Sequence, residues 1–296
     1  MEKAIQYFVD YLKFEKRYSE HTVTSYQNDL LGLSSYIQQE FGNLYVKEIS
    51  SSYIRSWLAS LKEEKMSSRS IARKISALQS FFKWLVRTKT LEFSPMTNIN
   101  VPKPAKRLPV FVEEKDMDQL FTQVDFPDSW EGYTDRILLS VFYNTGMRLS
   151  ELINLREDKI DFGNKALKVL GKGNKERILP ISSKMVDSLK DYLQKKRKLL
   201  EDPDSKYLLV NAKGKKLYAK YVYRAAKKWL AMITTLDKKS PHVLRHSFAT
   251  HMANSGADLN AIKELLGHSS LAATQVYTHN TIEKLRDVYK KAHPKA

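Results

Sequence analysis

Cysteine is absent from the 296 residues of the chain. Disulfide bonds, a thiolate nucleophile and thiolate metal ligands are therefore excluded. No stretch approaches the roughly 18 consecutive apolar residues that a membrane helix needs, and the start of the chain lacks the pattern of a signal peptide. Internal repeats and low-complexity tracts are missing as well. These absences predict a cytoplasmic protein without a membrane anchor, whose chemistry uses oxygen, nitrogen or bound ions.

Acidic residues are scarce, with 33 against 50 lysines and arginines, and the formal net charge is +17. Residues 205–236 contain no acidic residue at all, while lysine, arginine, tyrosine and tryptophan accumulate there. Such a stretch can be a solvated face. However, a long field of one sign disfavours folding unless an anion neutralises it, which favours contact with nucleic acid.

The chain is predicted to have two domains joined by a linker. Residues 95–109 hold four prolines, several basic residues and no acidic one, which is typical of an extended basic linker. Before this linker, apolar residues recur at spacings of three and four, which predicts a small all-helical domain over residues 1–94. These residues are Tyr7, Tyr11 and Phe14, then Ile54, Trp57, Leu58 and Leu61, and then Ile71, Ile75, Leu78, Phe82 and Leu85. The last group lies on a helix that Ser67 or Ser68 is predicted to cap.

The second domain, residues 110–296, mixes helices with a small amount of strand. Helical patterns dominate, but residues 166–170 and 177–181 are typical of short strands that flank a glycine-rich turn at 171–175. This predicts a β-hairpin projecting from a helical body. The expected fold class is therefore mainly α, with an N-terminal helical domain and a C-terminal, mostly helical α+β domain that carries a small antiparallel sheet.

The first motif that could carry chemistry is T-G-M-R-L-S-E-L at residues 145–152. Gly146 is predicted to end one helix and Arg148 to open the next. The arginine would then lie near exposed backbone amides, where an anion is readily held. Taken alone, an arginine at a helix start is usually a surface charge.

The second motif is S-P-H-V-L-R-H at residues 240–246. Ser240 is predicted to cap a helix that has Pro241 in its first turn. His242 and Arg245 are three residues apart and therefore share one face of that helix.

A metal site at this second motif is the competing interpretation. His242 and His246 have the four-residue spacing of a zinc-binding helix, but Val243 stands where a metalloprotease has its glutamate. Arg245 would also place a fixed positive charge beside the metal. A phosphate suits the histidine and arginine pair better.

The third motif covers residues 258–279, where Asp258 caps a helix and Gly267 ends it. His268 then lies in the turn and Tyr277 on the following helix. By geometry alone this segment could be a helix-turn-helix DNA reader, with Tyr277 a half-buried aromatic residue.

The combined set favours phosphoryl transfer over these separate interpretations. A pentavalent phosphate gains negative charge in its transition state, so fixed guanidinium donors stabilise it preferentially. Nearby cations would also favour the phenolate of Tyr277, and a lysine at the hairpin tip can protonate the leaving sugar oxygen.

These motifs together resemble the tyrosine recombinases, and the size of the chain is closest to the bacterial Xer type. The similarity runs from Y-F-V-D-Y-L near the start through S-S-R-S-I-A-R-K-I-S-A-L to H-P-K at the end. The resemblance implies an N-terminal SAM-like core-binding domain and a C-terminal catalytic domain that close around DNA. It implies a catalytic set of Arg148, Lys172, His242, Arg245, His268 and the nucleophile Tyr277, with Glu151 in a supporting role.

The resemblance also implies a site-specific recombinase that needs no metal, cofactor or ATP and works near the nucleoid. Chromosome-dimer resolution at cell division is favoured, while a mobile-element or phage integrase and a tyrosine-type topoisomerase are the alternatives. An architectural protein that only binds duplex DNA would lack the catalytic set. DNA contacts are expected from Arg69, Arg73, Lys83, Arg87, Lys103, Lys106, Arg107, Lys175, Arg177, Lys215, Lys220 and Arg224.

The family works as a tetramer on paired DNA sites. A homotetramer and a heterotetramer with a second recombinase both remain open, as does activation by a DNA translocase. Residues 281–296 carry apolar side chains at helical spacing, and they are expected either to pack on a neighbouring subunit or to fold back on their own domain.

Overall fold

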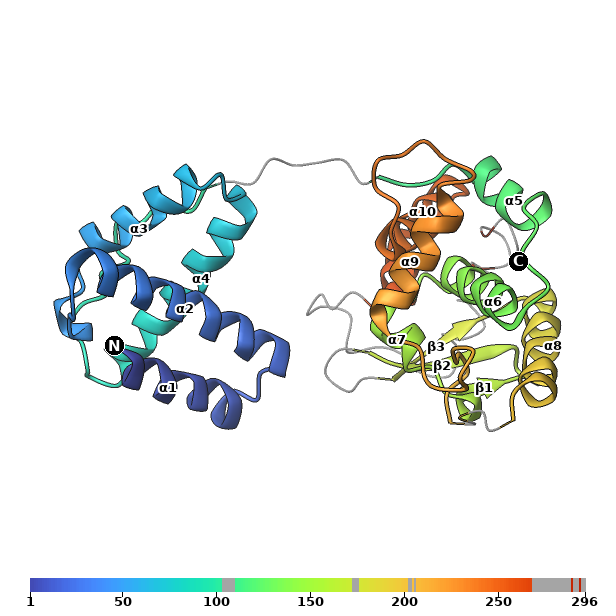
Figure 1. Cartoon of the computed structure of the whole chain (residues 1–296), viewed down its shortest axis with the longest axis horizontal. Coiled ribbons are helices and arrows are strands. Elements are labelled where there is room, and N and C mark those ends of the chain that lie inside the picture. The colour runs from blue at the N-terminus through green and yellow to red at the C-terminus, as the bar shows by residue number, and fades with distance from the viewer. Residues whose placement is uncertain are drawn as a thin grey trace. The chain divides into compact units, whose positions relative to one another are not determined.

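Two hydrophobic cores organise the chain and divide it into units of residues Met1–Arg107 and Leu108–Ala296. The computed structural model describes residues 1–102, 110–171, 176–201, 204, 206–267, 289 and 293. Most of these residues are helical, and a small sheet lies in the second unit (Figure 1). No helix within these ranges has both the length and the hydrophobicity needed to span a membrane.

The first unit has only helical elements among its described residues. They are α1 (Glu2–Asp10), a π-helical turn (Tyr11–Glu15), α2 (Glu20–Phe41), a 3-10 turn (Val46–Glu48), α3 (Ser51–Glu63) and α4 (Ser68–Arg87). The predicted apolar stripe of α4 is buried in full. Ser67 caps this helix as expected, because its Oγ accepts a hydrogen bond from the Ser70 amide at 3.2 Å.

The face predicted for α1 and the turn after it is wrong. Tyr7 and Phe14 are 56% and 67% exposed, whereas the stripe of Ile5, Phe8, Val9 and Leu12 is buried. This stripe repeats at i, i+3, i+4 and i+7, which covers a helix face more completely than the aromatic spacing does. Phe8 also packs against the rings of α4, including Phe81 at 5.4 Å between centroids.

The packed part of the first unit extends beyond residue 94. Met96 and Ile99 are 6% and 8% exposed and belong to its core, so the early part of the predicted linker is folded against the helices. Residues 103–109, including Lys103, Lys106 and Arg107, lie outside the described residues.

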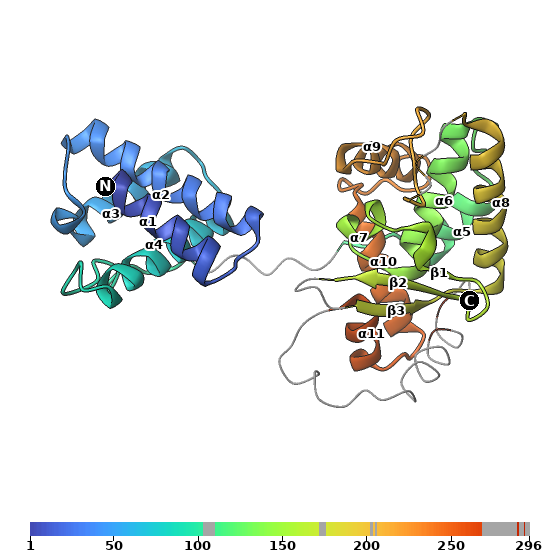
Figure 2. The same cartoon turned by 90° about the horizontal axis from the view of Figure 1, so that it is seen from below.

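The second unit combines a helical body with an antiparallel sheet (Figure 2). Its elements are α5 (Glu114–Thr122), α6 (Trp130–Thr145), α7 (Leu149–Ile153), a 3-10 turn (Glu157–Lys159), β1 (Ile160–Asp161), β2 (Ala166–Leu170), β3 (Glu176–Pro180), α8 (Ser183–Leu199), α9 (Ala219–Leu230), α10 (Pro241–Asn254) and α11 (Leu259–Leu266). The strand order is β1-β2-β3, with Leu170 opposite Glu176 and Val169 opposite Arg177. This confirms the predicted fold class, including the hairpin.

Helix α6 organises the core of the second unit, since it packs against α10 on one side and α8 on the other (Figures 1 and 2). The buried carboxylate of Asp135 on α6 fixes α9, because it accepts hydrogen bonds from Tyr221 Oη at 2.9 Å and Trp229 Nε1 at 2.7 Å. Helix α11 packs against β3. The end of α11 therefore lies close to β3, and the end of α6 is joined to α10 by the hydrogen bond from Arg245 to the Gly146 carbonyl.

Two residues from the end of the chain are buried in the core of this same unit. Tyr289 and His293 are 2% and 4% exposed. Tyr289 Oη donates to Asn144 Oδ1 at 3.3 Å, and His293 Nε2 lies 3.3 Å from the carbonyl oxygen of Tyr143. Both contacts are to α6 of the same chain.

Candidate active site

A glycine turn places Arg148 at the start of α7. Gly146 ends α6 in the left-handed region, with φ 57°, as its position in the motif predicts. A Cβ at this position would lie 2.4 Å from Cδ1 of Phe248, so the chain passes α10 too closely for a side chain. Arg148 follows two residues later at the N-cap position of α7.

Arg245 is held inside the unit by backbone carbonyls. Its side chain comes from α10 and the residue is 8% exposed. Nη1 donates to the Gly146 carbonyl at 2.6 Å, and Nη2 donates to the Leu266 carbonyl at 2.7 Å. Burial, together with the nearby charge of Arg148, lowers the pKa of Arg245 to about 10, so the group stays protonated at neutral pH.

The guanidinium of Arg148 approaches the same helix end as that of Arg245. Arg148 Nη2 donates to the Gly267 carbonyl at 2.5 Å, next to the Leu266 carbonyl that binds Arg245. These carbonyls form the C-terminus of α11, where the helix dipole is negative and stabilises cations. The Arg148 side chain is 31% exposed, so part of it remains open to a ligand.

Glu151 is the buried carboxylate of this cluster. It accepts hydrogen bonds from the Arg148 amide at 2.7 Å and from Arg148 Nη1 at 2.9 Å. Burial alone would raise its pKa, but the hydrogen bonds from Arg177 and Arg148 outweigh that effect and lower the pKa to about 2. The carboxylate is therefore ionised, and its hydrogen bonds orient Arg148.

Arg177, which was predicted to contact DNA, makes ion pairs and hydrogen bonds within the protein. Its Nη1 and Nη2 donate to the two oxygens of Glu151 at 2.8 and 2.7 Å, and its Nε donates to the Leu265 carbonyl at 2.9 Å. The side chain is only 13% exposed. The sequence did contain a signal for this, because the hairpin places Arg177 opposite the buried Val169, and cross-strand partners share one face of a sheet.

The two histidines of the second motif are exposed on α10. Pro241 opens this helix and Ser240 occupies its N-cap position, although the serine side chain makes no capping hydrogen bond. Burial, then the neighbouring His242 and Arg245, lower the pKa of His246. Among the described residues, no group of three or more histidine, aspartate or glutamate side chains could hold a metal ion.

The remaining predicted catalytic residues, Lys172, His268 and Tyr277, lie outside the described residues, as does Lys175. Gly267, the residue directly before His268, ends α11 with φ 64°. A Cβ on Gly267 would lie 3.0 Å from Arg177 Nη1 and 3.1 Å from Arg148 Nη1. Because Gly267 has no side chain, both arginines can approach the backbone directly before His268.

Comparison with known proteins identifies the family. A model described as the phage integrase family matches residues 110–284, and one for the phage integrase N-terminal SAM-like domain matches residues 5–89. The chain belongs to the phage integrase family. Two relatives named tyrosine recombinase XerC are each 40% identical to this chain. The match to the relative from Oceanobacillus iheyensis covers 100% of this chain and 97% of the relative. The match to the relative from Staphylococcus saprophyticus covers 100% of this chain and 99% of the relative.

A solved structure shares the fold of this phage integrase family member. It is a post-cleavage complex of the XerH site-specific recombinase with a palindromic difH substrate. The match has a TM-score of 0.71 and 23% identity, and it covers 90% of this chain and 78% of the XerH chain.

The other basic residues predicted to contact DNA differ in how accessible they are in this integrase-family chain. Arg73 pairs with the buried carboxylate of Asp29 and donates to Ser25 Oγ at 2.6 Å, so it also fixes α4 against α2. Lys74, which sequence reasoning missed, pairs with the same carboxylate at 3.1 Å. Arg73 is nevertheless exposed, at 48% of its side chain. The other exposed residues of this set are Arg69, Lys83, Arg87, Lys215, Lys220 and Arg224.

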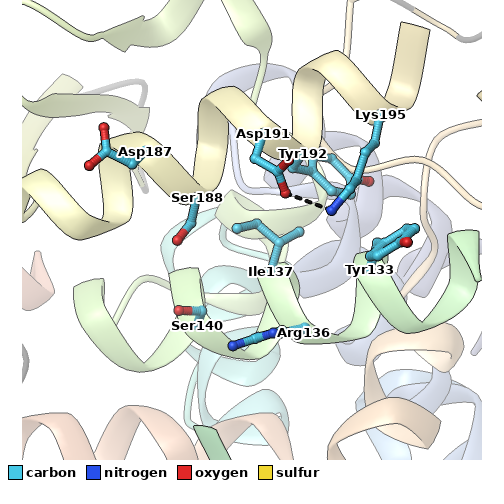
Figure 3. A pocket seen from close by; sticks show the side chains of 9 residues that line it. All are labelled: Tyr133, Arg136, Ile137, Ser140, Asp187, Ser188, Asp191, Tyr192 and Lys195. Carbon is cyan, nitrogen blue, oxygen red and sulfur yellow. Dashed lines mark hydrogen bonds and ion pairs between the residues drawn. The ribbon is translucent and has the colours of Figure 1, made fainter. Parts of the chain in front are cut away.

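A pocket of about 360 Å³ lies between α6 and α8 (Figure 3). Its lining includes Arg136, Asp187, Asp191 and Lys195, and an ion pair of 2.8 Å joins the last two. The charges are mixed and none of the predicted catalytic residues lines it, so we assign it no role in the chemistry.

Proposed function

We propose that this chain is a site-specific DNA recombinase that cuts and rejoins duplex DNA through a covalent bond to Tyr277, and that it resolves chromosome dimers. The observation that carries the proposal is the convergence of Arg148 and Arg245 on adjacent carbonyls, Gly267 and Leu266, directly before His268. Full-length similarity to proteins named tyrosine recombinase XerC supports it, and favours this role over a mobile-element integrase.

The chemistry is an in-line phosphoryl transfer. The Tyr277 phenol oxygen forms a bond to the scissile phosphorus while the bond from phosphorus to the 5′ sugar oxygen breaks. His242 acts either as the general base that takes the phenol proton or as an orienting group, and Lys172 gives a proton to the leaving oxygen, which departs as a free 5′-hydroxyl. The product is a 3′-phosphotyrosyl link that retains the energy of the broken bond, so another strand's 5′-hydroxyl can attack it without ATP.

Arg148 and Arg245 stabilise the transition state in this mechanism. Both are fixed before the substrate arrives, by Glu151 and by the carbonyls at the ends of α6 and α11. Fixed donors need no reorganisation as charge develops on the non-bridging oxygens, which makes their electrostatic contribution large. His268 adds a further hydrogen bond to the phosphate.

The proposed partners follow from the same chemistry. Exchange between two duplexes needs four active sites, so we propose a tetramer on paired DNA sites, formed by this chain alone or with a second recombinase. The exposed basic residues of α4 and α9, among them Arg69, Lys220 and Arg224, would contact phosphates. The first unit would act as the core-binding domain and the second unit as the catalytic domain.

A covalent-trapping experiment tests the nucleophile. The protein is incubated with nicked candidate sites from its own genome, and covalent complexes are detected on a denaturing gel. We expect the wild-type chain to form a complex and Tyr277→Phe to form none while still binding DNA. Tyr7→Phe, at an exposed position of α1, is the matched control and should behave as wild type. A denaturation-resistant complex with Tyr277→Phe would show that another residue is the nucleophile.

A further inference from the structure

We propose that Arg177 is a positioning residue for strand cleavage, which locks Glu151 and the end of α11 together so that Arg148 is correctly oriented. This inference rests on the function proposed above. It gives Arg177 a role distinct from both DNA contact and direct catalysis.

The contacts of Arg177 join two separate parts of the site. Its two Nη groups bind both oxygens of Glu151, on α7, while its Nε binds the Leu265 carbonyl near the end of α11. Arg148 spans the same two elements, since it binds Glu151 through Nη1 and the Gly267 carbonyl through Nη2. The two arginines therefore form parallel cross-links between α7 and α11, and Arg177 is the more buried of the two, at 13% against 31% exposure.

The geometry requires an arginine rather than a positive charge alone. A planar guanidinium can make a bidentate pair with a carboxylate and a third bond through Nε, whereas the lysine ammonium is a point charge on a flexible stem. Loss of the Arg177 guanidinium would leave the buried Glu151 with Arg148 as its only ion-pair partner among the described residues. Arg148 would then be drawn toward the carboxylate, and the turn that precedes His268 would lose one of its anchors.

A single-turnover experiment separates positioning from DNA contact. Arg177→Lys and Arg177→Gln are compared with wild type on a nicked site at saturating DNA, with the rate constant and the amplitude of covalent-complex formation measured separately from binding affinity. We expect both variants to lose about 10-fold or more in rate constant, with binding changed by less than about 3-fold, because small misplacements of a catalytic group are costly.

Arg156→Gln is the matched control. Arg156 makes a similar bidentate pair, with Asp158 at 2.8 and 2.9 Å, but both side chains are exposed. Its rate constant should stay close to that of wild type.

The outcomes are distinct. If Arg177→Lys retains the wild-type rate constant while Arg177→Gln binds DNA weakly, Arg177 is a DNA contact and the proposal is wrong. If only the amplitude falls in both variants, the residue maintains folding and nothing more, which also overturns it. Failure of the wild-type chain to form any covalent complex would instead count against the proposed function.

Discussion

Glu151 is the residue on which the charge balance of the candidate site depends. It lies among Arg148, Arg177 and Arg245. Burial is the largest cause of the lowered pKa of Arg245; the charges of Arg148 and Arg177 lower it further, while that of Glu151 raises it. The arginines thus repel one another, and the carboxylate offsets part of this repulsion. Its pKa of about 2, against an ordinary value of 4.5, expresses how strongly the folded state favours the ionised form.

This lowered pKa predicts a pH dependence of stability. A depressed pKa stabilises the folded state above the unfolded value of 4.5, and that contribution is lost as the pH falls from 4.5 toward about 2. For Glu151 it amounts to about 3 kcal/mol, taking 1.4 kcal/mol per pH unit. Urea unfolding of wild type and Glu151→Gln should give a difference in unfolding free energy that is constant above about pH 5 and shrinks below it. A difference that persists unchanged near pH 3 would contradict the assignment.

At the scale of elements, the sequence predicts long periodic helices and glycine turns well. The α4 stripe, the hairpin and the ends of α6 and α11 at Gly146 and Gly267 all agree with the structure. Strand β1 could not be predicted, because two residues show no alternation of burial. The exposed aromatic face of α1 was mistaken for the buried one because tyrosine and phenylalanine count as apolar in a periodicity whether or not they pack.

The candidate site was predictable in its residue types and only partly in its contacts. Spacing places Arg148 at a helix start and Arg245 one turn into another helix. Neither spacing nor composition reveals that both groups bind carbonyls at the end of α11, because those contacts join residues 21 and 119 positions apart. The role of Arg177 needed the hairpin register combined with the burial of its cross-strand neighbour.

The turn between α6 and α7 offers a test at this scale. In Gly146→Ala, the alanine would have to adopt the left-handed conformation that Gly146 has, and its Cβ would lie 2.4 Å from the Phe248 ring. We expect a loss of about 2–4 kcal/mol in unfolding free energy, from backbone strain plus overpacking. Gly256→Ala is the matched control, since that glycine has φ 82° but no atom within 4 Å of an added Cβ. Its loss should be about 1–2 kcal/mol from strain alone, and equal losses in the two variants would contradict the role of Phe248.

At the scale of the whole molecule, the chain has two cores and one chemically specialised unit. The tail is joined to that unit at two described positions. The ring of His293 stacks on that of Tyr289 with centroids 5.0 Å apart, and it lies 5.1 Å from the ring of Tyr143. Tyr143 and Asn144 are the residues just before the turn that leads to Arg148, so the end of the chain packs beneath the start of the candidate site.

Removing the Tyr289 ring should therefore destabilise the second unit. Tyr289→Ala is expected to lower its unfolding free energy by about 3 kcal/mol or more, the usual cost of deleting a buried aromatic ring. Tyr223→Ala, at a residue 40% exposed on α9, should cost much less. Urea unfolding followed by tryptophan fluorescence provides the measurement. Equal, small effects in both variants would show that Tyr289 does not pack in its own subunit in solution.

The three arginines that gather at the end of α11 have a consequence for how substrate and fold depend on each other. One carboxylate and the partial charge of a helix end do not fully compensate three guanidinium groups, so the folded chain carries an unbalanced charge in its interior. In the function proposed above, a phosphodiester that enters the site would supply the missing counter-ion and offset this repulsion. Nucleic acid would then stabilise the fold of the second unit as well as serve as its substrate.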